Sequence, residues 1–157
     1  MPTTIDFSKL SLRGAFDLAI AIEEEAQLRY QEFAARVSDP AAAAFFLEMV
    51  QNESRHRHQL ESRRHVTFRH EPERLSTSLL DDEVEAPDPA EVQAAIPVRQ
   101  AMEVALRAEV RAHDFYDRAL PHLEDPDVRA FFEELREEES EHQRLLRGKL
   151  AALDPGP

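Results

Sequence analysis

The chain carries the same pattern of glutamate and histidine residues twice. Three residues in its first half recur as the same residue types exactly 86 positions later: Glu23, Glu53 and His56 are matched by Glu109, Glu139 and His142. A carboxylate on one helix, followed about thirty residues later by Glu-x-x-His on the next, is the arrangement with which a helical bundle holds two metal ions in its core. The duplicated pattern therefore predicts four helices around one shared metal centre.

The similarity between the two halves extends beyond these six positions. Residues 15–60 align without gaps on residues 101–146. Identical pairs include Ala19 and Ala105, Ala26 and Ala112, Tyr30 and Tyr116, Asp39-Pro40 and Asp125-Pro126, Phe45-Phe46 and Phe131-Phe132, Ser54 and Ser140, and Leu60 and Leu146. Unrelated segments of ordinary composition would match at roughly one position in fifteen. The pattern therefore indicates an internal duplication of a helical hairpin.

Apolar periodicity and helix-capping residues set the expected elements. Apolar residues recur at spacings of three and four, which is typical of a helix packed on one side. Each Asp-Pro pair is expected to end one helix and start the next, because Asp is a favourable N-cap and Pro a favourable first helical residue. The predicted helices cover about residues 11–37, 40–65, 97–122 and 126–152.

The segment 66–96 between the two hairpins has no counterpart in the repeat. It contains Pro72, Pro87, Pro89 and the acidic cluster 81–83, and is too polar for one continuous helix. Asp88-Pro89 is expected to start a short helix within it. The first and third helices can be antiparallel only if this link crosses the bundle, so we expect a long crossover.

Length and charge restrict the class of protein. The 157 residues are 42% hydrophobic, which suits one core, and we expect a single domain over residues 1–157. The net charge of −13 argues against nucleic acid or an anionic membrane as a partner, since phosphate binding requires a basic face. Residues 1–10 contain Asp6 and Lys9 and resemble neither a signal peptide nor an anchor, so a cytoplasmic location is expected.

The chain contains no cysteine. A disulfide framework and a four-cysteine electron-transfer site are therefore both excluded within it. If the metal centre undergoes redox chemistry, the electron donor must be a separate protein.

The candidate ligands occupy the apolar faces of their predicted helices. Residues three and seven apart share a helix face, so Glu53, His56 and Leu60 point in the same direction. Charged side chains are seldom buried without a partner, and four glutamates would balance two divalent cations. A single Glu-x-x-His is more often a surface feature, but two copies in register with upstream glutamates favour a metal site.

Other residues near the predicted ligands have weaker claims to a role. Tyr30 and Tyr116 lie on the same faces as the glutamates that precede them and are expected to hydrogen-bond ligand carboxylates. His113 lies one turn after Glu109, but its counterpart is Gln27, which favours a surface or outer role over metal ligation.

These motifs together resemble the rubrerythrin branch of the ferritin-like superfamily. The resemblance rests on Glu23-x-x-Ala26-x-x-x-Tyr30, Asp39-Pro40, Phe46, Glu53-x-x-His56 and their counterparts Glu109-x-x-Ala112-x-x-Phe115-Tyr116, Asp125-Pro126, Phe132 and Glu139-x-x-His142. It implies an all-α, ferritin-like four-helix bundle. It also implies that Glu53 and Glu139 bridge two metal ions, with Glu23, Glu109, His56 and His142 as the outer ligands, one histidine per ion.

Two departures from the family pattern affect the expected reaction. The chain lacks the cysteine-rich, rubredoxin-like module of full-length rubrerythrins, and it has Ala112 where they carry an additional carboxylate. The remaining six ligands also resemble bacterioferritin and manganese catalase centres. Oxygen and nitrogen ligands suit iron or manganese, and their spacing does not separate the two.

The leading hypothesis is a di-iron oxidoreductase that reacts with hydrogen peroxide or dioxygen, as a peroxidase or ferroxidase. It is expected to bind two iron ions, with manganese as an alternative, to receive electrons from a separate donor protein and to form a homodimer. The alternatives are a ferritin-like iron-storage protein without turnover, a di-manganese catalase-like enzyme, and a helical interaction module whose metal is purely structural.

Overall fold

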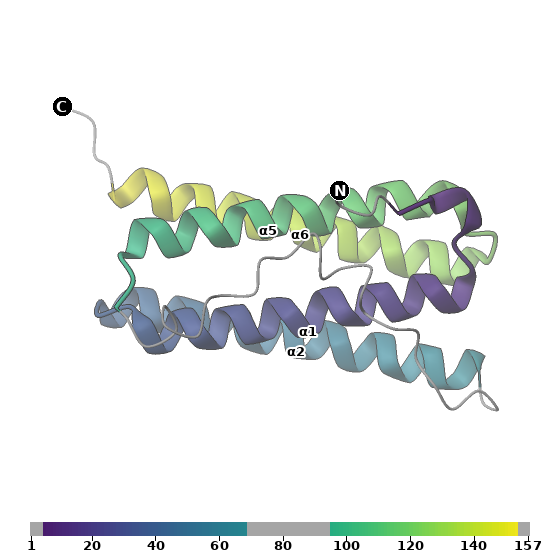
Figure 1. Cartoon of the computed structure of the whole chain (residues 1–157), viewed down its shortest axis with the longest axis horizontal. Coiled ribbons are helices and arrows are strands. Elements are labelled where there is room, and N and C mark those ends of the chain that lie inside the picture. Colours follow the sequence, from purple (N-terminus) through teal and green to yellow (C-terminus); the bar gives the residue numbers. More distant parts are fainter. Residues whose placement is uncertain (1–4, 69–94, 154–157) are drawn as a thin grey trace.

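The computed structural model describes residues 5–68 and 95–153, and over this range the chain is an all-α four-helix bundle. The long helices are α1 (Leu12–Arg36), α2 (Pro40–Thr67), α5 (Val98–Ala119) and α6 (Pro126–Leu153) (Figure 1). Two short 3₁₀ helices, η1 (Phe7–Lys9) and η2 (Leu120–His122), precede α1 and follow α5. The predicted fold class is confirmed.

Capping residues explain why these helices begin where they do. The side chains of Ser11 and Asp39 accept hydrogen bonds from the backbone N–H groups of Gly14 and Ala42, so they satisfy donors that the first helical turn leaves without partners. Asp125 caps α6 in the same way, accepting from the N–H groups of Asp127 and Val128. The two Asp-Pro signals therefore act as predicted.

The third helix departs from its prediction at the C-terminal end. Residues 97–122 were expected to be continuous, but the α-helix ends at Ala119 and continues as η2. Pro121 explains the change, because proline has no N–H to donate to the carbonyl four residues earlier, so the α-helical hydrogen bonding stops although Leu120 keeps α-helical backbone angles.

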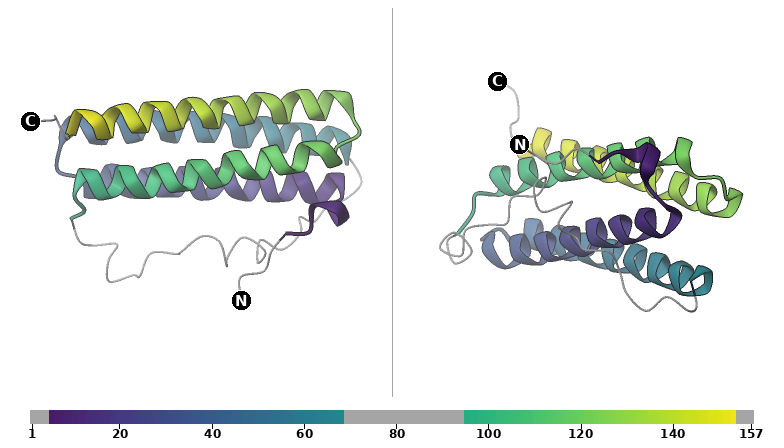
Figure 2. Two further views of the ribbon diagram at one scale, coloured as in Figure 1. Left: turned by 90° about the horizontal axis from the view of Figure 1, so that it is seen from above. Right: turned by 45° about the vertical axis from the view of Figure 1, so that its right-hand side comes forward.

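The helices form two antiparallel hairpins, α1–α2 and α5–α6, and α1 runs antiparallel to α5 (Figures 1 and 2). Phe68, at the end of α2, packs edge-on against Phe16 near the start of α1, with 6.3 Å between ring centroids. At the other end of α1, the N–H of Ile96 donates to the carbonyl of Arg36 (3.3 Å). The link between the hairpins therefore joins opposite ends of the bundle, as predicted. Residues 69–94, including the expected helix start at Asp88, lie outside the described residues.

The hydrophobic core consists of two clusters spaced along the bundle. One contains Phe16 and Ile20 of α1 together with Tyr116 and Phe132, and the other contains Tyr30 and Phe33 of α1 together with Phe46 and Leu146. On α1, Glu23 lies between the two clusters. The aromatic rings of each cluster pack closely, with centroid distances of 5.4 Å for Tyr116–Phe132 and 5.9 Å for Tyr30–Phe46. The core thus encloses a short polar layer from both ends.

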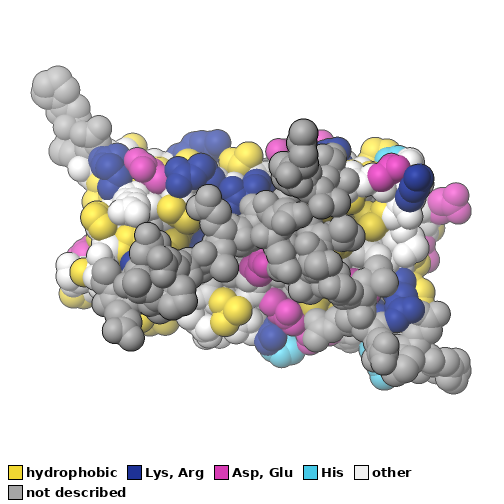
Figure 3. All heavy atoms as spheres, viewed as in Figure 1, with side chains coloured by type: hydrophobic (Ala, Val, Ile, Leu, Met, Phe, Trp, Pro, Cys, Tyr) yellow, Lys and Arg dark blue, Asp and Glu magenta, His cyan; other side chains and the backbone are white. Residues whose placement is uncertain are grey.

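The surface is mixed in charge where it can be seen. On the face in Figure 3, acidic and basic side chains are interspersed among hydrophobic ones. Among the described residues, no helix is both long enough and apolar enough to span a membrane.

Candidate metal centre

All six predicted ligands meet in the polar layer between the two core clusters. Each helix contributes: Glu23 from α1, Glu53 and His56 from α2, Glu109 from α5, and Glu139 and His142 from α6. None of the six residues is more than 4% exposed to solvent. The helical periodicity that places them on apolar faces also brings them together across the bundle.

The six side chains form two overlapping groups, each of which could hold a metal ion. One group is Glu23, Glu53, His56 and Glu139; the other is Glu53, Glu109, Glu139 and His142. Within each group the candidate ligand atoms lie within 4.8 Å of one another. Glu53 and Glu139 belong to both groups, so both candidate positions would share them.

The carboxylate of Glu53 faces both histidines. Its Oε2 lies 3.6 Å from Nδ1 of His56, and its Oε1 lies 3.2 Å from Nδ1 of His142. The outer glutamates complete the arrangement, because Glu23 Oε2 lies 3.5 Å from His56 Nδ1 and Glu109 Oε2 lies 3.5 Å from His142 Nδ1. The imidazole rings themselves stack with centroids 5.9 Å apart.

Several buried polar atoms in this layer make no hydrogen bond within the described structure. Those on the side of the candidate ligands are Glu23 Oε2, both carboxylate oxygens of Glu53, Glu139 Oε1, and Nδ1 of His56 and of His142, and His56 Nε2 is a further one on the opposite side of its ring. A buried polar atom without a hydrogen-bond partner costs about 1–3 kcal/mol. The atoms on the ligand side converge on the same space, and all are oxygen or imidazole nitrogen. The donor set therefore fits two divalent transition-metal ions.

Two tyrosines fix the outer glutamates, as predicted, and each does so across the hairpin boundary. Tyr116 of α5 donates a hydrogen bond to Glu23 Oε1 of α1 (2.6 Å), and Tyr30 of α1 donates to Glu109 Oε1 of α5. Burial raises the pKa of both phenols well above its ordinary value, with a further contribution from the neighbouring glutamates. Both tyrosines therefore remain protonated donors. The sequence pattern did not predict that each tyrosine would bond a glutamate of the other hairpin, because this depends on how the two hairpins pack.

Sequence reasoning missed one residue that contacts a candidate ligand. Oε2 of Glu138, on α6, contacts Nε2 of His56, the ring nitrogen that faces away from the centre. A carboxylate in this position orients an imidazole and increases its basicity. The repeat comparison obscured Glu138, because its counterpart is the neutral residue Asn52. The one sequence feature that could have pointed to Glu138 is its position directly before the candidate ligand Glu139.

The remaining histidine candidate lies outside the centre. His113 belongs to neither group of candidate ligands, and its Nδ1 lies 3.5 Å from Oδ1 of the neighbouring Asp114. This placement agrees with the surface or outer role that its glutamine counterpart favoured. Phe45, Phe46, Phe131 and Phe132 are buried in the core.

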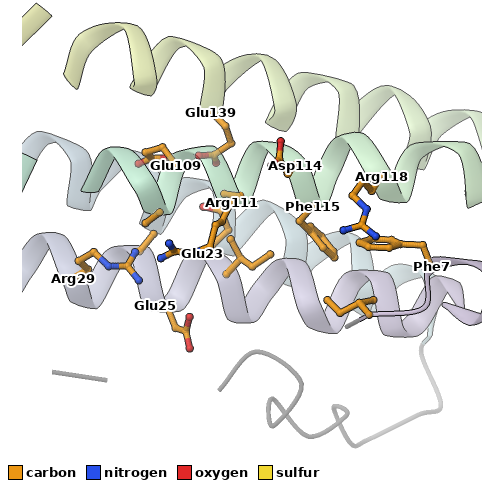
Figure 4. Close-up of a pocket in the computed structure, with 15 residues that line it drawn as sticks. Phe7, Glu23, Glu25, Arg29, Glu109, Arg111, Asp114, Phe115, Arg118 and Glu139 are labelled. Carbon is orange, nitrogen blue, oxygen red and sulfur yellow. The ribbon is translucent and has the colours of Figure 1, made fainter. Parts of the chain in front are cut away.

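A cavity of about 250 Å³ lies between α1 and α5 and reaches the centre. Its inner wall includes Glu23, Glu109 and Glu139 (Figure 4). Phe7 and Phe115 lie toward the other end, next to Arg118. The candidate metal centre is therefore open to a pocket on one side of the bundle.

Burial and mutual repulsion change the pKa values of the candidate ligands. Burial, followed by the charge of Glu53, raises the pKa of Glu23 well above its ordinary value; burial and the charge of Glu109 do the same for Glu139. For His56, burial acts to lower the pKa, but Glu23 and Glu53 outweigh it and raise the pKa to about 10. Burial acts to raise the pKa of Glu53, but the adjacent Glu23, His142 and His56 lower it below its ordinary value. Metal binding must therefore displace protons.

These shifts predict how the stability of the metal-free protein depends on pH. Glu23, Glu139 and His56 have raised pKa values in the folded state, so the stability they contribute is present at low pH and is lost as pH rises through those values. The pKa of Glu53 is shifted in the opposite direction, so the stability that Glu53 contributes falls as pH falls. That loss occurs only below its ordinary pKa of 4.5. From about pH 8 to about pH 5, the metal-free protein should therefore become more stable, while protons compete with metal in the loaded protein.

Thermal unfolding of metal-free and metal-loaded protein across this pH range would measure the effect. The difference in Tm should shrink as pH falls. Glu139→Gln should weaken the pH dependence of the metal-free protein, whereas Glu133→Gln, at an exposed position on the same helix, should leave it unchanged. A Tm difference that is constant or grows toward acid pH would show that these groups do not share a buried site.

Glu138 leads to a second prediction. Glu138→Ala should weaken metal binding at the position that includes His56 by about 10- to 100-fold, because the imidazole loses its orienting carboxylate. The second position should change little. A metal titration that resolves two binding phases would measure this, with Glu137→Ala as the exposed control. Equal weakening of both phases would contradict a specific effect through His56.

Comparisons with known proteins agree with this fold. The family model for rubrerythrin matches residues 15–150, and no match was found among functionally curated proteins. An uncharacterized conserved protein from Magnetospirillum magnetotacticum MS-1 superposes with a TM-score of 0.76 at 23% identity, over 94% of this chain and 97% of the other. A hypothetical protein from Pyrococcus furiosus gives 0.74 at 18% identity, over 96% of each chain.

A third structure connects the fold to a named domain type. It is a two-domain protein from Anabaena variabilis ATCC 29413 with DJ-1/ThiJ/PfpI-like and ferritin-like domains, and it superposes with a TM-score of 0.71 at 20% identity. The match covers 95% of this chain and 42% of that one. At these identities the three structures support the four-helix fold alone. The family match covers both hairpins and all six candidate ligands, and on that basis the chain belongs to the rubrerythrin family.

Proposed function

We propose that this protein is a carboxylate-bridged di-iron oxidoreductase that reduces hydrogen peroxide. The observation that carries the proposal is the position of Glu53, whose two carboxylate oxygens face different histidines inside a fully buried layer. A structural metal site needs only one closed set of ligands around one ion. A paired site with a shared carboxylate suits chemistry in which two electrons move together.

The six residues divide into two roles. Glu53 and Glu139 would bridge the ions, since both belong to each candidate group. Glu23 with His56 would complete one position, and Glu109 with His142 the other. When bound, the reduced iron pair would supply two electrons for cleavage of the O–O bond. The net reaction is H₂O₂ with two electrons and two protons giving two molecules of water.

The protein's own groups position this chemistry. Tyr30 and Tyr116 hold Glu109 and Glu23 by hydrogen bonds from opposite hairpins, which restrains the outer ligands when the charge of the centre changes. The aromatic clusters on both sides limit water to the cavity between α1 and α5. Because the chain has no cysteine, a separate donor protein would return the electrons.

Ala112 supports a second candidate function. Rubrerythrins carry an additional carboxylate at this position, and its absence leaves a six-ligand centre similar to that of manganese catalases. A di-manganese centre would disproportionate hydrogen peroxide without an external electron donor. Iron storage is the remaining alternative, and a particle the size of a closed shell of subunits, rather than a dimer, would favour it.

The metal assignment predicts about two iron or manganese ions per chain after reconstitution, measured by elemental analysis. Glu53→Ala and Glu139→Ala should each abolish binding of both ions, because a bridging ligand serves both positions. His56→Ala and His142→Ala should weaken mainly one ion each. Stoichiometric zinc at one ion per chain, or equal losses in all four variants, would contradict the assignment.

The proposed reaction predicts turnover of hydrogen peroxide by metal-loaded protein supplied with a one-electron donor. Loss of peroxide without oxygen release, together with stoichiometric oxidation of the donor, would support the reductase. Oxygen release at half the rate of peroxide loss, without a donor, would support the catalase-like alternative. Glu53→Ala should lose activity together with its metal, and absence of turnover at full metal loading would contradict both activities.

A further inference from the structure

The cavity between α1 and α5 is larger than hydrogen peroxide requires. Its volume is about 250 Å³. An engineered apolar cavity of about 150 Å³ binds benzene, whereas a water-sized molecule needs on the order of 10–15 Å³. The cavity thus has room for an organic group next to the candidate metal centre.

The two ends of the cavity differ in chemistry. Its inner end is bounded by the candidate ligands Glu23, Glu109 and Glu139, and the region toward Phe7 and Phe115 is lined by aromatic rings beside the guanidinium of Arg118 (Figure 4). The rings of Phe7 and Phe115 are 5.9 Å apart, and the guanidinium of Arg118 covers the Phe7 ring at 4.6 Å. Ile5 and Ile22 extend this apolar wall. A ligand that fits both ends has an oxygen-containing head and an apolar body.

Two alanines line the cavity close to the candidate ligands. Ala26 and Ala112 lie one helical turn after Glu23 and Glu109, at equivalent positions of the repeat, and both line the cavity. A larger residue at either position would take up cavity volume next to the carboxylates. Ala112 therefore has two consequences: the position lacks the additional carboxylate of full-length rubrerythrins, and its small side chain leaves space in the cavity.

The charges around the cavity favour a neutral ligand. Its lining includes Arg29, Arg111 and Arg118, but also the carboxylates of Glu25 and Asp114. The two signs are mixed, so no single-sign field selects an anion or a cation. An uncharged molecule enters such a pocket without losing the hydration of an ion.

We propose that this cavity binds the apolar substituent of an organic hydroperoxide, with the hydroperoxide group directed toward Glu23, Glu109 and Glu139. The proposal rests on the proposed function and specifies its substrate class. In the net reaction, ROOH takes up two electrons and two protons; the O–O bond breaks, and ROH and water form. A reduced metal pair held by these residues would supply the electrons, and a one-electron donor protein would restore them.

Substitutions that fill the cavity provide the test. Ala112→Leu on α5 and Ala26→Leu on α1 each place a larger side chain in the cavity. Because the two positions lie on different helices, one variant remains informative if the other fails to fold. Ala35→Leu, at an exposed position on α1 outside the cavity, is the matched control. Metal content is measured for every variant, so that loss of the metal pair is separated from loss of the pocket.

The turnover measurement compares kcat/KM for cumene hydroperoxide with kcat/KM for hydrogen peroxide in the metal-loaded proteins. The ratio should fall by about tenfold or more in both cavity variants, since a steric mismatch in an apolar pocket changes selectivity by this order. It should be unchanged in Ala35→Leu. A ratio that stays constant in cavity variants with full metal content would overturn the proposal, even if hydrogen peroxide is reduced normally.

A binding measurement separates this proposal from the proposed function. The product alcohol of cumene hydroperoxide, 2-phenyl-2-propanol, should bind wild-type protein in ligand-observed NMR and should bind the cavity variants more weakly. Reduction of hydrogen peroxide without alcohol binding would overturn the pocket assignment alone. Alcohol binding that the cavity variants weaken, without turnover of either peroxide, would overturn the proposed function and with it the hydroperoxide assignment, while leaving an apolar ligand site.

Discussion

The structure depends on the burial of four carboxylates and two imidazoles in one layer of an otherwise apolar core. Glu23, Glu53, Glu109 and Glu139 would repel one another strongly if all were ionised without cations. The raised pKa values of Glu23 and Glu139 show that protons must partly compensate when no metal is bound. Two divalent cations would neutralise the four carboxylates and supply partners for the buried atoms that have none. Metal binding at this layer would therefore be linked to folding.

The surrounding architecture confines this charged layer. The core clusters built around Phe16 with Phe132 and around Phe46 with Leu146 lie on either side of it along the bundle. The Tyr116–Glu23 and Tyr30–Glu109 hydrogen bonds connect the hairpins at the level of the ligands. Apolar packing thus sets the position of the layer, and hydrogen bonds set the orientation of its outer carboxylates.

Features that repeat in the sequence could be predicted from it. The ligands, the capping aspartates and the tyrosines all occur in two copies at fixed spacing, and helical periodicity converts that spacing into a common face. Features that occur once were missed. Glu138 has Asn52 as its counterpart, Pro121 ends α5 without an equivalent in the first hairpin, and Phe7, which forms one end of the cavity, precedes the repeat. Such features depend on tertiary contacts that no local pattern encodes.

The division of ligands between the hairpins bears on how such a centre arises. Each group of four candidate ligands takes three residues from one hairpin and one from the other: Glu139 joins Glu23, Glu53 and His56, and Glu53 joins Glu109, Glu139 and His142. One hairpin alone therefore completes neither position, but two identical hairpins related by a twofold axis would complete both. The internal repeat is what gene duplication and fusion of such a symmetric pair would leave. Joining the copies in one chain would then allow each half to change separately, and the repeat does differ at Glu138 and Asn52.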